Sequence, residues 1–456
     1  MRVLSQTKKR GLRRLGTPVV MALGFLVIIA AGTLLLTLPL SSADHTFTSP
    51  LTAAFTSVSA TCVTGLTVVN TGVHWSIFGQ AVILCMIQIG GLGFMTLTVL
   101  LLLLIRHAVS PKERMMVAMS YNLPTYENTT SLVRRIVTGT FSLELVGAIL
   151  LFTQFVRYPG LSVAEAVWRS LFTAVSAFCN AGFDLMGEDG MGVFAGNWVV
   201  NLTLIALIIL GGLGFVVWSD LESWLIRRRR LSVYTRLVLG MTAALLAVGA
   251  LLFAVMEWNN PDTIGGAPVG QKLLMSLFHS ATLRTAGFAM FDNGCMRDGT
   301  LVLSMVLMFI GGASGSTAGG VKVVTVAVLF WTVFSVAFGR PDPVICKRQV
   351  SKDSFTRAVS VVVMQILFAL LGASVVSAVT PFDLTQVMYE VISAVSTVGL
   401  TMGITPSLPA LARLMIMLLM YLGRVGILTV TYAAMMNLRR DRGADITYPD
   451  ANLLIG

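Results

Sequence analysis

The chain has 456 residues, of which 55% are hydrophobic and only 12% are charged. A soluble domain carries roughly 25% charged residues, so this composition excludes a soluble protein and predicts an integral membrane protein. The formal net charge of +11 does not indicate nucleic-acid binding, because the basic residues fall in alternate loops, which is the pattern of membrane topology.

The charge pattern predicts where the chain crosses the membrane. Basic groups precede the first apolar run and recur in the second, fourth and later alternate loops, whereas the intervening loops lean acidic. By the positive-inside rule both termini and the basic loops are cytoplasmic. The predicted cytoplasmic segments are an N-terminus 1–17, loops 106–135, 227–235 and 337–353, and a C-terminus 438–456.

Between these segments the apolar runs form four repeats. Each repeat is predicted to contain an outer helix, a short half-helix, a loop and an inner helix; the repeats span 18–105, 136–226, 236–336 and 354–437. The half-helices, near 50–60, 165–177, 271–281 and 385–394, are too short to cross a bilayer, which takes about 20 residues. We therefore predict an all-α membrane protein in which four parallel helix–pore-loop–helix repeats surround a central pore with pseudo-fourfold symmetry. The inner helices are expected near 78–105, 198–226, 300–336 and 410–437.

A glycine-ended stretch of small and hydroxyl residues follows each half-helix. Non-helical backbone at membrane depth must line water or an ion, and carbonyl groups from four loops can replace the hydration shell of a cation. Glycines that pack helices together would instead lie inside long helices, so we favour a selectivity filter. The predicted filter residues are Val63, Thr64 and Gly65; Asn180, Ala181 and Gly182; Thr285, Ala286 and Gly287; and Thr397, Val398 and Gly399.

A second glycine-rich stretch interrupts the third inner helix. It has five glycines in ten residues, each costing about 1 kcal/mol against alanine in a helix, so the helix must break there. A phosphate-binding loop would need a preceding strand and a Lys-Ser/Thr pattern, which are absent. We predict a mobile constriction, or gate, below the filter; its residues are Gly311, Gly312, Ala313, Ser314, Gly315, Ser316, Thr317, Ala318, Gly319 and Gly320.

Arg424 stands in the middle of the fourth inner helix, where an arginine must face the protein interior or a partner. One interpretation is a buried ion pair, for example with Glu390. The other is a positive barrier in the pore, which would repel a cation at 4 Å by about 4 kcal/mol at an effective dielectric constant near 20. The gate prediction includes Arg424 on the second interpretation.

Other motifs carry less weight. Lys322 follows the glycine-rich stretch and either faces the cytoplasmic vestibule or extends to the interface. The two Gly-Gly-Leu-Gly-Phe segments at 90–94 and 211–215 lack the strand of a dinucleotide-binding motif, so close helix packing explains them better. No nucleophile–base pair or metal-ligand spacing indicates an enzyme. A solute symporter would require an intramembrane acid or broken helices in paired halves.

These motifs resemble the Trk/Ktr/HKT superfamily of potassium transporters, most closely the membrane subunits of bacterial Ktr systems. The resemblance covers nearly the whole chain and rests on five segments: Ala60–Leu66, Gln88–Thr96, Arg284–Phe288, Gly315–Lys322 and Thr397–Gly403. It implies the filter glycines, the gate loop and the pore arginine at the positions given above. Sodium-selective plant relatives carry serine at the first filter glycine, so the resemblance implies that Gly65 favours potassium.

The resemblance also implies activity and partners. It implies K⁺ uptake across the cell membrane, with K⁺ held at the filter carbonyls and Na⁺ as an activator. A sodium-selective or poorly selective monovalent cation transporter of the same superfamily is the alternative. It implies a homodimer in the lipid bilayer on a KtrA-type cytoplasmic ring that binds ATP and ADP, with no cofactor in this chain and no nucleic-acid partner.

Overall fold

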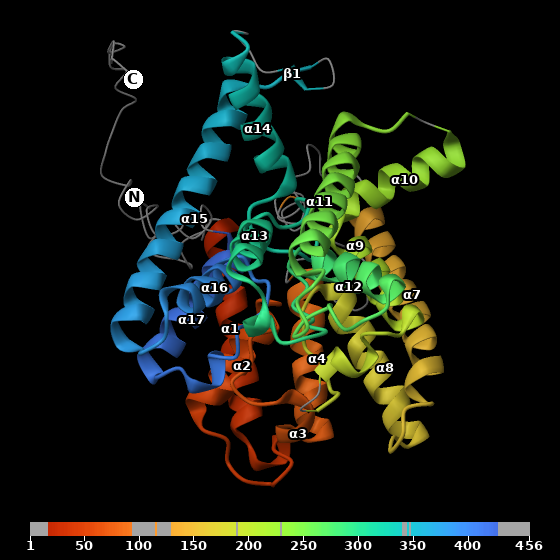
Figure 1. Cartoon of the computed structure of the whole chain (residues 1–456), viewed down its shortest axis with the longest axis vertical. Coiled ribbons are helices and arrows are strands. Elements are labelled where there is room, and N and C mark those ends of the chain that lie inside the picture. The colour runs from red at the N-terminus through yellow and green to blue at the C-terminus, as the bar shows by residue number, and fades with distance from the viewer. Residues whose placement is uncertain are drawn as a thin grey trace, which may run out of the picture.

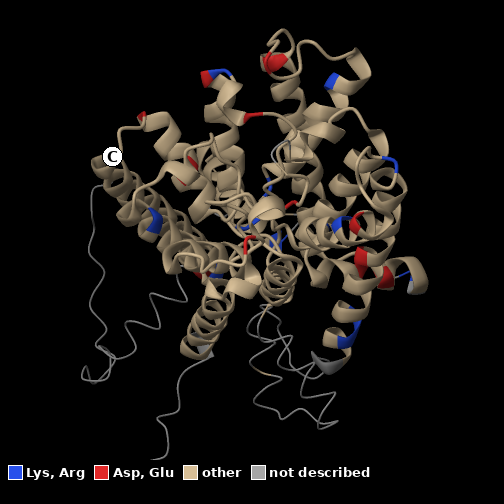
Figure 2. Cartoon of the chain, turned by 90° about the horizontal axis from the view of Figure 1, so that it is seen from below, with Lys and Arg blue, Asp and Glu red and all other residues tan. Residues whose placement is uncertain are grey.

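The computed structural model describes residues 17–93, 115, 129–187, 190–228, 230–339, 344–345 and 348–426. Its described part is built from helices, with one short hairpin (Figure 1). The predicted cytoplasmic termini lie outside the described residues, apart from Thr17, and so do most of the loop 106–135 and the end of the fourth inner helix. Charged residues are sparse along the ribbon (Figure 2).

Long apolar helices form the outer parts of the molecule. They are α1 (Thr17–Thr37), α7 (Thr129–Phe155), α11 (Val233–Glu257) and α15 (Lys352–Val379). In the most apolar 18-residue stretch of each of these helices, only 11% to 33% is buried inside the chain. Exposed apolar helices of more than 18 residues match the thickness of a bilayer. In the described residues four helices meet the criteria for a membrane span, or five if the bent pair discussed below counts as one.

Half-helices make up the interior. They are α2 (Pro50–Thr61), α8 (Val163–Cys179), α12 (Val269–Thr282) and α16 (Leu384–Val395). Their large side chains, among them Phe55, Phe172, Phe178, Phe278 and Tyr389, are almost fully buried. The carboxyl-terminal part of each half-helix is thus buried inside the chain, and each is too short to span the bilayer.

Local sequence signals start these half-helices. The hydroxyl of Ser49 accepts a hydrogen bond from the backbone of Thr52, and Pro50 occupies the first turn of α2. Ser162 and Glu165 form a reciprocal capping box on α8. Such caps satisfy backbone N–H groups that have no partner inside the helix. They fix where each half-helix begins and therefore where its carboxyl end lies.

The inner helices are shorter than predicted. They are α4 (Ile77–Leu92), α9 (Trp198–Gly212), α13 (Asp298–Phe309) and α17 (Ala410–Val425). The prediction of one continuous helix over 198–226 is wrong, because α9 and α10 (Phe215–Arg227) meet at an angle of 100°. Gly214 allows this bend because its φ is +87°, a conformation that glycine adopts without a steric penalty. A longer interruption separates α13 from α14 (Val323–Ala337), as the glycine-rich stretch predicts.

An outer helix, the half-helix that follows it and the inner helix after that make up one helix set, and the four sets pack in a closed order. Each outer helix packs on the half-helix that follows it: α1 on α2, α7 on α8, α11 on α12 and α15 on α16. Each inner helix packs on the half-helix of the next set: α4 on α8, α9 on α12, α13 on α16 and α17 on α2. The last contact returns to the first set, so the half-helices are held between neighbouring sets around a common centre.

Short elements complete the described structure. A four-residue helix α3 (Thr71–His74) precedes α4. Between α14 and α15 the strands β1 (Val344–Ile345) and β2 (Arg348–Gln349) pair antiparallel, at the upper end of the molecule in Figure 1. The 3₁₀ turns are η1 (Pro39–Ser41), η2 (Gly190–Phe194), η3 (Asn293–Cys295) and η4 (Thr405–Ser407).

Candidate functional site

The four predicted filter segments adopt the same unusual backbone. The residue two positions before each glycine has a left-handed φ, of 57° at Val63, 59° at Asn180, 66° at Thr285 and 51° at Thr397. Such a φ is uncommon for residues other than glycine and costs about 1–3 kcal/mol each. Four equivalent positions sharing one strained conformation indicate a built site.

The four glycines follow with φ values of 98°, 70°, 80° and 94° at Gly65, Gly182, Gly287 and Gly399. Two left-handed residues, separated by one residue, reverse the usual alternation of an extended chain. Successive carbonyl groups can then face one side of the segment. Glycine accepts this conformation at no steric cost.

The same glycines lie against one another in a ring. A Cβ atom added to Gly65 would lie 2.5 Å from the carbonyl oxygen of Ala181, and one added to Gly182 would lie 2.8 Å from the Cα of Gly287. A Cβ on Gly287 would lie 2.5 Å from the carbonyl oxygen of Val398 and 3.3 Å from the Cα of Gly399. A Cβ on Gly399 would in turn overlap the carbonyl oxygen of Thr64. A side chain at any of the four positions would therefore collide with the next segment.

Unpaired polar atoms gather at this ring. Among the described residues, the hydroxyls of Thr285 and Thr397 and the amide of Asn180 are buried without a hydrogen-bond partner. Buried polar groups are nearly always paired, and an unpaired one costs about 1–3 kcal/mol. These unpaired groups lie in the residues directly before the glycine ring.

Inner-helix glycines let the helices approach the half-helices closely. A Cβ on Gly90 would overlap the carbonyl oxygen of Thr61, one on Gly211 that of Phe178, and one on Gly423 that of Val395. The prediction that the Gly-Gly-Leu-Gly-Phe segments serve helix packing is therefore confirmed. It missed a second role: the third glycine of each segment ends its inner helix.

Three inner helices end at such a glycine. Gly93, Gly214 and Gly426 have φ values of 82°, 87° and 93°. The remaining inner helix, α13, which is the third in chain order, ends at Phe309, ahead of the glycine-rich loop. In the described residues the second and third inner segments are thus interrupted, whereas the sequence predicts a break only in the third.

The glycine-rich loop crosses the centre of the molecule. The backbone N–H groups of Ala313 and Thr317 donate to the carbonyls of Gly212 and Gly211, at 2.9 and 3.2 Å. The hydroxyl of Thr317 donates to the carbonyl of Phe178 at 3.2 Å. A Cβ on Gly319 would overlap the Thr397 hydroxyl beside the filter. The predicted gate segment therefore touches both the second and the fourth helix sets.

Lys322 closes this loop. Its Nζ donates to the carbonyl of Ala318 at 2.6 Å and lies 3.5 Å from that of Gly319. Whether the side chain faces the vestibule or extends to the interface stays a prediction. The ammonium group binds two carbonyls of the loop, a segment in which no helix pairs the backbone.

Arg424 reaches across to two other helix sets. Its guanidinium donates to the carbonyl of Thr317 in the loop and to that of Gly90 in α4, and lies 3.4 Å from the carbonyl of Gly91. Glu390, its predicted alternative partner, instead accepts a hydrogen bond from Thr405. The predicted mid-helix position is wrong, because α17 ends at Val425 and Arg424 lies in its last turn. Arg424 thus lies at the loop, as the barrier interpretation requires.

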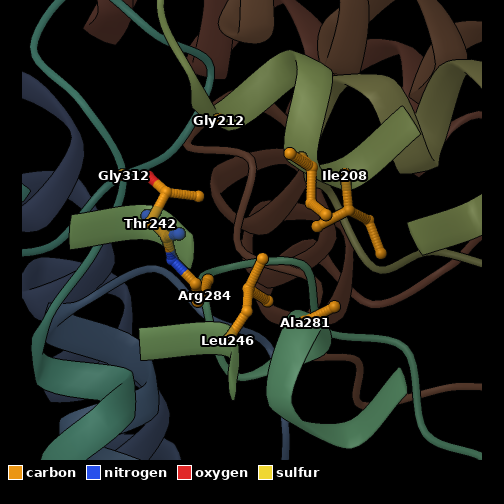
Figure 3. Close-up of a pocket in the computed structure, with 8 residues that line it drawn as sticks. Ile208, Gly212, Thr242, Leu246, Ala281, Arg284 and Gly312 are labelled. Atoms are coloured by element: carbon orange, nitrogen blue, oxygen red, sulfur yellow. The ribbon is translucent and has the colours of Figure 1, made fainter. Parts of the chain in front are cut away.

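Arg284 is a feature that the sequence analysis did not assign. It follows α12, is only 8% exposed, and its Nη2 lies 3.4 Å from the carbonyl of Gly311 at the start of the loop. Arg284 and Thr242 line a cavity of about 10 Å³, room for roughly one water molecule (Figure 3). Among the described residues, Arg284 Nε and the Thr242 hydroxyl have no partner. The signal in the sequence that could have pointed to Arg284 is its charge, directly before the filter residues Thr285, Ala286 and Gly287.

Comparison with known proteins identifies the family. The profile of the TrkH family, described as cation transport protein, matches residues 8–445. The chain belongs to the TrkH family. It is accordingly a multi-pass membrane protein of cation transport, and this family membership points away from an enzyme.

Two relatives match this chain over nearly its full length. It is 38% identical to Ktr system potassium uptake protein B of Bacillus subtilis, over 97% of each chain. It is 36% identical to potassium/sodium uptake protein NtpJ of Enterococcus hirae, over 98% of this chain and 99% of that protein. The predicted resemblance to Ktr membrane subunits is confirmed.

A solved structure has the same fold. The potassium transporter TrkH from Vibrio parahaemolyticus superposes with a TM-score of 0.71, covering 93% of this chain and 85% of that one. The two sequences are 18% identical, so this likeness concerns the fold alone.

Proposed function

We propose that the chain is the ion-translocating subunit of a potassium uptake system. The observation that carries the proposal is the closed ring of Gly65, Gly182, Gly287 and Gly399. Four loops that meet in this way can present backbone carbonyls to a dehydrated cation. The four helix sets would then be repeats around a pseudo-fourfold pore axis.

Further features support cation passage along this axis. The carboxyl ends of the half-helices carry a partial negative charge of about half a unit, which favours cations. The loop 311–320 and Arg424 would form the barrier below the filter. Serving as a gate, they would prevent leak while the system is inactive.

The relatives' names extend the proposal. Proteins called Ktr system potassium uptake protein B suggest a membrane subunit of a multi-component system. For this chain we expect a homodimer in the cell membrane on a KtrA-type nucleotide-binding ring, with ATP or ADP bound there and Na⁺ as activator. K⁺ is the substrate.

Growth of cells that lack their own potassium uptake systems tests the proposal. Expression of the full chain, together with the regulatory subunit from the same genome, should restore growth at low potassium. Sodium uptake without potassium uptake would contradict the proposal.

A poorly selective monovalent cation transporter is the second candidate. It is favoured by the unequal residues Val63, Asn180, Thr285 and Thr397 at one filter level, and by the similarity to a protein named for potassium and sodium uptake. Potassium uptake that equal concentrations of sodium suppress would identify this alternative.

A further inference from the structure

A backbone hydrogen bond ties the middle residue of each filter segment to the half-helix before it. The N–H groups of Thr64, Ala181 and Val398 donate to carbonyls five residues earlier, at 2.8, 2.7 and 2.8 Å. The acceptors all belong to serines: Ser59, Ser176 and Ser393. The third set differs, because Ala286 donates to Thr282 at 3.0 Å and alanine stands at the equivalent position 281.

Two of these serines make a second contact through the side chain. The Ser59 hydroxyl accepts a hydrogen bond from the N–H of Gly65 at 3.0 Å. The Ser393 hydroxyl accepts one from the N–H of Gly399, also at 3.0 Å. Among the described residues the Ser176 hydroxyl, although buried, has no partner. The filter is therefore tethered by a side chain in the first and fourth sets.

This contact fixes the direction of a filter carbonyl. The N–H of Gly65 and the carbonyl of Thr64 belong to one planar trans peptide and point in opposite directions. Because the N–H points back to Ser59, the carbonyl of Thr64 points away from the half-helix, toward Gly399. The same geometry at Ser393 directs the carbonyl of Val398 toward Gly287, whose added Cβ would lie 2.5 Å from it.

We propose that Ser59 and Ser393 are positioning residues for ion selectivity. Each hydroxyl holds one carbonyl of the filter ring in the orientation that a K⁺ ion requires. Without the hydroxyl the peptide could rotate, and the ring could shrink around Na⁺ or turn a carbonyl away. The carbonyls of Ala181 and Ala286 have no such tether, so the ring is rigid on one side and more adaptable on the other. This inference rests on the proposed function.

Ion binding to the purified full chain tests it without depending on the gate. Isothermal titration calorimetry would give the K⁺ and Na⁺ dissociation constants of the wild type, Ser59→Ala, Ser393→Ala and the matched control Ser176→Ala. Loss of one hydrogen bond is expected to lower the ratio of K⁺ to Na⁺ affinity by about 3- to 10-fold in the first two variants. The control should stay within about twofold of wild type.

Two kinds of failure are distinguishable. If the wild type shows no preference for K⁺, the proposed function is overturned. If it does, and Ser59→Ala and Ser393→Ala both match Ser176→Ala, the positioning role is overturned. Thermal unfolding of the same samples separates a loss of stability from a loss of selectivity. Ser59→Cys keeps the side-chain volume with a weaker acceptor, and replaces Ser59→Ala should that variant not purify as a single species.

Discussion

Single residues decide the geometry of the filter. Gly65 combines a φ of 98° with close contact to the backbone of the next segment, so both its conformation and its lack of a side chain are required. Val63 has a left-handed φ without being glycine, which shows that the surrounding structure imposes the conformation. The strain is maintained because the half-helix holds the segment on one side and the neighbouring segments hold it on the other.

Gly65→Ser should weaken potassium selectivity. The added Cβ would lie 2.5 Å from the carbonyl oxygen of Ala181 and would displace it. We expect the K⁺ to Na⁺ uptake ratio to fall about tenfold, which corresponds to about 1.4 kcal/mol.

Gly160→Ser is the matched control. Gly160 also has a positive φ, of 86°, but an added Cβ there meets nothing within 4 Å. It reproduces the backbone strain outside the filter, so its ion preference should match that of the wild type. An unchanged uptake ratio in Gly65→Ser would refute the filter role of Gly65.

At the scale of elements, the interrupted inner helices leave backbone groups that other segments must satisfy. A continuous helix satisfies its own backbone, whereas a broken one leaves carbonyls that need partners. Here those partners come from other segments: Lys322 binds carbonyls of the loop, and Arg424 binds Thr317 and Gly90. The loop is thus held by charged hydrogen bonds together with neutral ones, such as those from the backbone of Ala313 and Thr317 to the end of α9.

Deleting the loop 311–320 should raise the potassium flux, because it removes the constriction below the filter. Arg424→Gln should act in the same direction with a smaller effect, since it removes the charge but keeps most of the side-chain volume. Uptake of ⁸⁶Rb⁺ into proteoliposomes would measure both. Equal or lower flux at equal protein incorporation would show that this segment is not a barrier.

At the scale of the whole molecule, each inner helix packs on the half-helix of the next set. The half-helices are therefore positioned by two neighbours, and a shift of one set would be transmitted to the filter of the next. Exposed apolar outer helices surround this assembly. A partner acting on cytoplasmic segments could bias the loop through α14, which begins directly after it.

The chain should copurify with a soluble nucleotide-binding subunit. If the Ktr-like organisation holds, ADP and ATP should change the potassium flux of the complex while leaving that of the isolated chain unchanged. Size-exclusion chromatography with light scattering would give the mass of the membrane part, for which a dimer is expected. A monomer that transports potassium at full rate without any partner would contradict this organisation.

The sequence alone determined the membrane character, the four glycine-ended segments and the broken third inner helix. These follow from composition, length and local backbone preference, which act within a few residues. Only the tertiary structure decided the ring of glycines, the helix ends at Gly93, Gly214 and Gly426, the cavity at Arg284 and the unequal tethers of Ser59, Ser176 and Ser393. These depend on contacts between segments far apart in the chain, where identical residue types make different bonds because their neighbours differ.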